Sequence, residues 1–179
     1  MSSTVGKVIT CRAPICWGPK LGQTIEEIEV DPPKAKEVRV KIVANGICRS
    51  DAHHLDGDSC DVDLKYPNIL GHEGSGIVES VGEGVKSVAP GDHVILLFLP
   101  RCQKDNECEN CSNPKTNICK LDNFNTTCTM RDNTIRFRHK GKQIYHYSGI
   151  STFAEYTVAR EDQVAKVTNM LSLKSYNII

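Results

Sequence analysis

Four cysteines near the middle of the chain have the spacing of metal ligands. In RCQKDNECENCSNPKTNIC they are separated by five, two and seven residues, and the segment is too polar to form an apolar core. Four thiolates around one zinc ion would give this segment its shape. A tetrahedral site of four sulfur atoms leaves no position for substrate, so this zinc would be structural. The ligands would be Cys102, Cys108, Cys111 and Cys119.

Two other interpretations of this cluster stay open. The cysteines could be free surface thiols, although crowded thiols invite oxidation and have no packing role. They could also belong to a DNA-binding zinc finger. Lysine plus arginine and aspartate plus glutamate each number 22, and no basic recognition helix is visible. This balance is compatible with a small uncharged substrate and gives no expectation of nucleic acid or membrane as a partner.

Two further segments carry side chains suited to a catalytic metal. GICRSDAHHLDGD, residues 46–58, contains Cys48 at a helix start, and ILGHEGSGIVESVG, residues 69–82, contains His72 in a glycine-bounded turn. Catalytic zinc takes mixed sulfur and nitrogen ligands and keeps one position open. Taken singly, a buried cysteine is an ordinary small hydrophobe and a lone histidine is an ordinary core residue. The two residues alone leave these explanations open.

Strands and one short helix are expected to position these segments. A capping residue at Ser50 or Asp51 and a glycine at Gly57 predict a helix between them. Residues 99–125 are polar and lack alternation, so we expect an excursion without its own core. A mainly β, partly open barrel is the natural packing of the predicted strands. These are residues 7–13, 24–30, 37–46, 76–82, 92–98, 151–159 and 163–167.

The length of 179 residues suits one main domain. The start, MSSTVGKVIT, lacks a secretion signal, and no stretch approaches the roughly 20 apolar residues of a membrane span. We therefore expect a cytoplasmic protein whose nine cysteines stay reduced.

The sequence also resembles a known family. GHEGSGIVESVGEGVKSVAPGDHV, residues 71–94, is similar to the zinc-side signature of medium-chain zinc alcohol dehydrogenases, and the CRSD segment and the four cysteines occur in the family's order. The resemblance runs from Gly6 to about Val167. It departs in one place, because the family usually has two residues, not five, between its first two lobe cysteines.

The resemblance implies a GroES-like catalytic domain over residues 1–167, with a structural-zinc lobe at about 99–125. It implies that Cys48 and His72 are ligands of a catalytic zinc, and that the four clustered cysteines bind the structural zinc. In relatives a third cysteine ligand and a strand, glycine-rich turn and helix for NAD follow the point where this sequence stops. Here the nearest match, Gly74-Ser75-Gly76, lacks the third glycine of a dinucleotide fingerprint.

The resemblance also assigns a proton path. Ser50 matches the hydroxyl that bonds the alcohol, and His53 matches the histidine that passes the proton outward. Asp51 matches a carboxylate that orients His72, and Glu73 matches a glutamate behind the metal. Ser50 and Asp51 would equally serve as helix caps.

Two further matches concern the cofactor and the substrate. Arg49 matches an arginine that contacts the cofactor pyrophosphate, although it would equally be a solvated charge, and Phe98 matches an aromatic wall of the alcohol pocket. Residues 168–179 depart from the family. We therefore expect a shortened gene product without an NAD-binding Rossmann domain, monomeric and inactive alone, whereas full-length relatives dimerise.

The implied function is oxidation of an alcohol to an aldehyde or ketone, with zinc polarising the oxygen and hydride passing to NAD. Two alternatives remain: a non-enzymatic zinc-binding product, and a polyol or glutathione-linked formaldehyde dehydrogenase relative. Ser50 with His53 favours the ordinary alcohol pocket. The remaining histidines and cysteines match nothing functional, and structural or surface roles are expected for His54, His93, His139, His146, Cys11, Cys16, Cys60 and Cys128.

Overall fold

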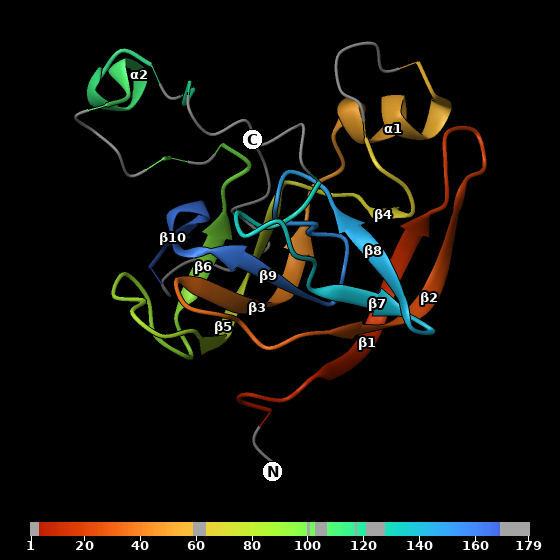
Figure 1. Ribbon diagram of the computed structural model, residues 1–179, viewed down its shortest axis with the longest axis horizontal. Coiled ribbons are helices and arrows are strands. Elements are labelled where there is room, and N and C mark those ends of the chain that lie inside the picture. The colour runs from red at the N-terminus through yellow and green to blue at the C-terminus, as the bar shows by residue number, and fades with distance from the viewer. Residues whose placement is uncertain are drawn as a thin grey trace.

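The computed structural model describes residues 4–58, 64–99, 101–102, 107–116, 118–120 and 128–168. Two β-layers make up most of this part of the chain (Figure 1). One layer is a closed barrel, in the order β1 (Ile9–Cys16), β2 (Gln23–Val30), β7 (Phe137–His139), β8 (Lys142–His146) and β4 (Asn68–Ile69). The other is a sheet, in the order β10 (Val164–Lys166), β6 (His93–Leu96), β5 (Gly74–Val81), β3 (Glu37–Asn45) and β9 (Tyr156–Arg160).

The mainly β architecture predicted from the sequence is confirmed, and the structure separates its closed and open parts. Two-residue β4 closes the barrel, because Asn68 pairs with Cys16 on one side and with Tyr145 on the other. The five-stranded sheet stays open, with β10 and β9 at its edges. Its central pair, β3 and β5, is antiparallel and contains two register shifts, between Arg39 and Val40 and between Ile42 and Ala44.

Each layer buries its own apolar cluster. Inside the barrel, alternate residues of β1 and β2 meet Phe137 and Ile144 of the β7–β8 hairpin. Against the sheet, Val38 and Val40 of β3 pack with Val94 of β6 and their neighbours. Buried and exposed side chains alternate along most of β1 and at the end of β2, as expected of strands with one face in a core, whereas the first four residues of β3 are all buried.

The predicted helix is confirmed as α1 (Arg49–Asp56), but the predicted capping residue, Ser50 or Asp51, is wrong, because both lie inside the helix. Cys48 is its N-cap residue, and the Asp51 carboxylate accepts the Cys48 backbone N–H at 3.2 Å, as in a capping box. The helix ends at Gly57, whose φ of 68° is the left-handed conformation that favours glycine.

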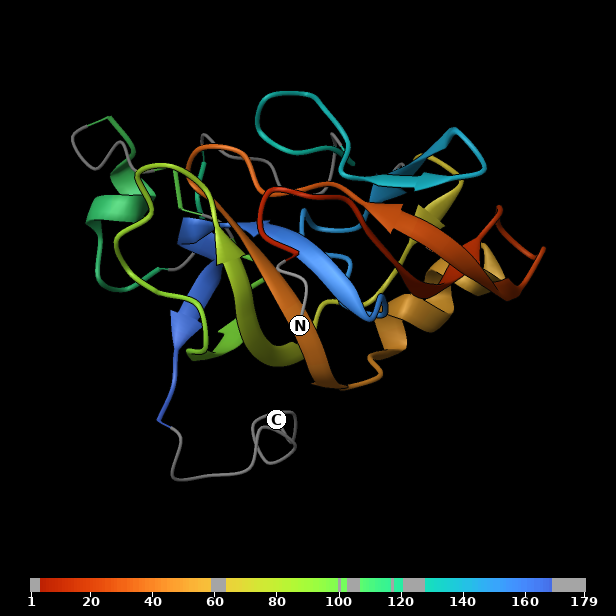
Figure 2. The ribbon, with the colours of Figure 1, turned by 90° about the horizontal axis from the view of Figure 1, so that it is seen from below.

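Two shorter helical segments complete the described structure. The four-residue helix α2 (Glu109–Ser112) lies within the cysteine-rich excursion, and the 3-10 turn η1 (Glu161–Gln163) joins β9 to β10. The helices α1 and α2 lie at opposite ends of the molecule in both views (Figures 1 and 2). Neither helix has the length and apolar character needed to cross a membrane. Cys60 and the predicted tail from residue 169 onward lie outside the described residues.

Candidate metal centres

The two segments around Cys48 and His72 meet at the start of α1. The Gly71 backbone N–H, directly before His72, donates to the Asp51 carboxylate at 3.0 Å, so one side chain ties the helix start to the turn that precedes β5. One ligand atom each from Cys48, His72 and Glu73 lies within 4.8 Å of the other two. The first candidate centre therefore offers a sulfur, a nitrogen and a carboxylate oxygen.

Hydrogen-bonding groups surround the His72 ring. Its Nδ1 lies 3.5 Å from the Asp51 carboxylate, and its Nε2 lies 3.4 Å from the Ser50 hydroxyl. Burial lowers the pKa of His72, but Asp51 and then the Cys48 thiol outweigh this effect, and the net pKa is raised. A carboxylate behind the outer ring nitrogen is the usual partner of a metal-ligating histidine.

The surroundings of the Cys48 thiol favour its ionised form. Hydrogen bonds from the Ser50 side chain and backbone lower the pKa of Cys48, and His72 adds to the effect. Because a thiolate is the form that binds metal, this shift suits a ligand.

Two aromatic rings stand edge-on to the His72 ring. Phe98 lies 5.4 Å away at an interplanar angle of 79°, and Tyr147 lies 5.5 Å away at 74°. Tyr147 also packs edge-on against His54. Burial raises the pKa of Tyr147 to about 12, although its hydrogen bond with Ser50 opposes the shift, so its hydroxyl stays protonated. Sequence reasoning missed Tyr147, because its neighbours in the chain carry no ligand or catalytic pattern.

A second residue that the sequence analysis missed is Gly46. A Cβ atom at this position would lie 2.1 Å from the Glu73 carboxylate. The Gly46 backbone N–H also donates to the Glu73 carbonyl at 3.0 Å. Glycine is thus required sterically if Glu73 is to reach the metal-binding group, and a lone glycine in a sequence gives no sign of such a contact.

The other predicted site residues lie along α1. The His53 Nδ1 is 2.7 Å from the Asp58 carboxylate just beyond the helix, and 40% of the His53 side chain is exposed. Arg49 is exposed at the first position of the helix. The structure thus brings Ser50 and Asp51 close to His72 and places the His53 side chain on a partly exposed side of the helix.

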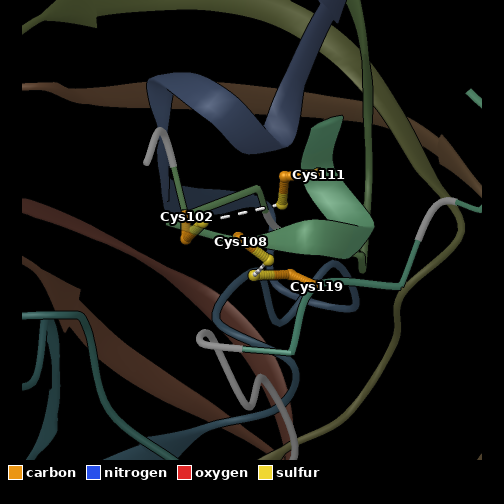
Figure 3. Close-up of side chains that lie close together, drawn as sticks. All are labelled: Cys102, Cys108, Cys111 and Cys119. Carbon is orange, nitrogen blue, oxygen red and sulfur yellow. Dashed lines mark hydrogen bonds between the residues drawn. The ribbon is translucent and has the colours of Figure 1, made fainter. Parts of the chain in front are cut away.

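The four clustered cysteines converge on one point (Figure 3). Their sulfur atoms all lie within 4.8 Å of one another, with 3.6 Å between Cys102 and Cys111 and 3.8 Å between Cys108 and Cys119. Cys108 is buried as the N-cap residue of α2, and Cys111 follows inside the helix. One short helix therefore supplies two of the four donors.

The ionisation of these thiols fits a cation at their centre. Hydrogen bonds, first from the Cys111 backbone N–H, lower the pKa of Cys108 to about 6. The Cys102 backbone N–H also lowers the pKa of Cys111, but burial and hydrogen bonds to the neighbouring sulfur atoms raise it to about 12. Four thiolates at these distances repel one another, so they coexist only around a positive charge. A closed set of four sulfur donors suits structural zinc.

Comparison with known proteins identifies the fold. The family model of the alcohol dehydrogenase GroES-like domain matches residues 34–169. The chain belongs to this family. It is also 49% identical over 180 residues to the class-3 alcohol dehydrogenase of Caenorhabditis elegans, a match that spans 100% of this chain and 46% of that protein. The chain thus spans about half the length of this curated relative.

Solved structures agree with this assignment. An alcohol dehydrogenase zinc-binding domain protein from Burkholderia ambifaria is 30% identical, with a TM-score of 0.81 over 92% of this chain and 43% of its own. Benzyl alcohol dehydrogenase from Acinetobacter calcoaceticus, 24% identical, shares the fold with a TM-score of 0.75 over 94% of this chain and 44% of its own. The resemblance to zinc alcohol dehydrogenases inferred from the sequence is therefore confirmed.

The glycine pair considered as a nucleotide fingerprint belongs to the sheet. Gly74, Ser75 and Gly76 are the first residues of strand β5, where they pair with β3. A Cβ on Gly76 would lie 2.3 Å from the Lys41 carbonyl oxygen, so this glycine permits close strand pairing. The histidines and cysteines without an assigned role are buried or half-buried; those described are His54, His93, His139, His146, Cys11, Cys16 and Cys128.

Proposed function

We propose that this chain is the catalytic part of a zinc-dependent alcohol dehydrogenase, which oxidises a small alcohol to an aldehyde or ketone with NAD as hydride acceptor. The observation that carries the proposal is the joint placement of Cys48, His72 and Glu73 within 4.8 Å of one another, beside Ser50 and Phe98.

Each residue of this centre has a proposed task. Cys48 and His72 would hold the zinc, with Asp51 fixing the orientation of the His72 ring. A zinc ion held there supplies polarisation of the alcohol oxygen. Ser50 lies 3.4 Å from His72 Nε2, where its Oγ would accept the proton of the alcohol hydroxyl.

The proposed route of the proton to solvent follows side chains of α1. His53, one turn further along α1, would receive the proton from Ser50 and release it to solvent beside Asp58. Phe98 would form an apolar wall for the alcohol, and Arg49, exposed at the helix start, would meet the pyrophosphate of NAD.

We further propose the following domain division, oligomeric state and cellular location. Residues 1–167 form the catalytic domain, with the structural-zinc lobe at about 99–125 and a divergent tail at 168–179. We also propose that the chain is monomeric and cytoplasmic. The structural zinc is held by the four clustered cysteines, Cys102, Cys108, Cys111 and Cys119.

A gain-of-activity experiment tests the proposal. The chain alone should not oxidise ethanol with NAD, whereas a fusion to the part of the Caenorhabditis elegans relative outside the match should do so. In the fusion, His72→Ala should abolish turnover and His139→Ala should largely preserve it. These histidines form a matched pair because they are 8% and 7% exposed. Equal losses, in fusions that remain folded, would contradict the catalytic assignment.

The same fusion distinguishes the substrate alternatives. Assays with ethanol, with a polyol, and with formaldehyde plus glutathione separate the three dehydrogenase types. A folded, zinc-loaded fusion without activity on any of them would favour a non-enzymatic zinc-binding role.

A further inference from the structure

A charged cavity lies apart from both candidate metal centres. Its volume is about 480 Å³, and its lining comes from the turn before β3, the segment before β7 and the junction of β9 with η1. Four of the lining side chains are cationic and three are anionic. The cations are Lys34, Lys36, Arg131 and Arg160; the anions are Glu37, Asp132 and Asp162.

The cavity carboxylates are shared among several cations. Asp162 accepts from Arg131 at 3.2 Å and from Arg160 at 3.1 Å. Asp132 lies 2.7 Å from the Lys34 ammonium and 3.2 Å from Arg136 behind the cavity wall. Each carboxylate thus divides one negative charge between two positive groups.

The remaining anions are engaged outside the cavity. Glu37 forms a two-armed ion pair with the buried Arg136. Lys36 pairs with Glu161 at 3.1 Å, and the other Glu161 oxygen accepts backbone N–H groups of Lys86 and Ser87. The local network therefore holds five cations, namely Lys34, Lys36, Arg131, Arg136 and Arg160, against four carboxylates, namely Glu37, Asp132, Glu161 and Asp162.

We propose that this cavity binds a small phosphate ester, with the phosphate held by Lys34, Lys36 and the guanidinium groups of Arg131 and Arg160. Guanidinium forks match phosphate oxygens, and a dianion competes for cations better than a single shared carboxylate does. A cavity of 480 Å³ has room for a sugar-sized substituent beside the phosphate. The Lys34 and Lys36 side chains are each 55% exposed, which leaves the entrance open to a charged ligand.

One contact connects this cavity with the cysteine lobe. Arg131 donates to the Arg101 carbonyl at 3.1 Å, and Arg101 in turn donates to the Cys111 carbonyl at 2.9 Å. A phosphate that draws the Arg131 side chain into the cavity would alter the backbone next to Cys102. Backbone amide signals of Arg101 and Cys102 should therefore shift together with those of the cavity residues.

Titration of the zinc-loaded chain with inorganic phosphate and with ribose 5-phosphate, followed by amide NMR, tests this proposal. Acetate at equal ionic strength is the control ligand. Both phosphates should give saturable shifts at the cavity and at Arg101, and the ester should bind more tightly. Shifts that acetate reproduces, or that do not saturate, would show ionic strength alone and overturn the proposal.

Two variants with opposite expected effects strengthen the test. Lys34→Gln removes a cavity cation and should weaken phosphate binding by about fivefold or more. Asp132→Asn removes a competing carboxylate and should tighten it by a similar factor. Lys142→Gln is the matched control, because Lys142 is an exposed lysine in β8, and its affinity should equal that of wild type.

Thermal unfolding of each variant checks that the fold is intact. If Lys34→Gln and Lys142→Gln bind phosphate equally well, the cavity charges form a structural network only.

Discussion

The types of ligand atom at the two candidate centres determine which of them binds zinc more tightly. The lobe offers four thiols within 4.8 Å, whereas the centre at α1 offers one thiol, one imidazole and one carboxylate. Zinc in proteins favours thiolate over carboxylate ligands when both are available, and a complete set of four sulfur atoms closes its coordination. Zinc is therefore expected to be held far more tightly in the lobe.

The first prediction follows from this difference. After dialysis against a weak chelator, the chain should retain close to one zinc, measured by atomic emission. Cys108→Ser or Cys111→Ser should remove this zinc, while Cys48→Ser should change the content little. Equal loss in all three variants would contradict the assignment of the retained zinc to the lobe.

A buried histidine gives the second prediction, which concerns acid stability. His146 is fully buried, and burial, with the nearby Arg136 charge, lowers its pKa to about 3. Between pH 6.5 and 3 the unfolded chain binds a proton here that the folded chain does not. The free energy of unfolding should therefore fall by about 1.4 kcal/mol for each pH unit over this range because of His146.

The variant His146→Gln tests this contribution. Glutamine retains an acceptor for the Arg136 backbone N–H, which His146 Nε2 accepts at 3.1 Å, and it does not titrate. The variant should be less stable near neutral pH but should lose stability more slowly on acidification, as measured by urea unfolding at several pH values. An unchanged pH slope would show that His146 is not buried in its neutral form.

Residue type in the sequence indicates the candidate zinc ligands, but it does not indicate the residues that pack around them. Cysteine and histidine are identifiable in the sequence because few other side chains bind zinc, and both clusters could be proposed from their spacing and from the family resemblance. Tyr147 and Gly46 could not, because one acts through a ring packed on His72 and the other through an absent Cβ. Such contacts depend on which segments become neighbours after folding.

At the scale of elements, the site depends on where α1 starts and ends. Its first residues carry the side chains that surround His72, and its last turn carries His53. The end is fixed by Gly57, whose backbone N–H donates to the His53 carbonyl. A change at this glycine should therefore affect both stability and the position of His53.

The third prediction compares two glycines with left-handed backbone conformations. Gly57 has a φ of 68° and Gly141 one of 78°, so alanine at either position should cost roughly 1–2 kcal/mol from the backbone alone. At Gly57 the added Cβ would also lie 2.9 Å from Pro19 Cβ, whereas nothing lies within 4 Å at Gly141. Chemical denaturation should show a distinctly larger loss for Gly57→Ala, and equal losses would mean that the Pro19 contact relaxes freely.

The elements differ in how far the sequence predicts them. The strands β1, β2, β3, β5 and β6 follow alternating stretches and lie close to their predicted positions. The hairpin of β7 and β8 was not predicted, because FRHKGKQIYH is rich in charged and polar residues. Its buried positions include two histidines: His139 pairs with the Glu27 carbonyl of β2, and His146 accepts the backbone N–H of Arg136, directly before β7. Polar side chains at buried positions break the apolar and polar alternation on which strand prediction relies.

At the scale of the whole molecule, a buried ion pair joins the barrel to the sheet. Arg136 precedes β7 of the barrel and is 1% exposed, and Glu37 begins β3 of the sheet and is 6% exposed. The Arg136 guanidinium donates to both Glu37 oxygens. Strand β3 then leads through Gly46 to Cys48, so the same strand that is anchored to the barrel delivers the first metal ligand.

The fourth prediction tests this junction. Glu37→Gln leaves the Arg136 charge buried with Asp132 at 3.2 Å as its remaining carboxylate, and removing one partner of a buried pair costs about 3–5 kcal/mol. The control, Glu155→Gln, removes the carboxylate of the Arg12–Glu155 pair at the surface, where solvent already screens the attraction, so its loss should be much smaller. Urea unfolding of the two variants measures the difference directly.

Because β3 also positions Cys48, Glu37→Gln should lower the metal affinity of the centre at α1 while Glu155→Gln leaves it unchanged. Similar stability losses in the two variants would mean that the barrel and the sheet are held together by their apolar contacts rather than by this ion pair.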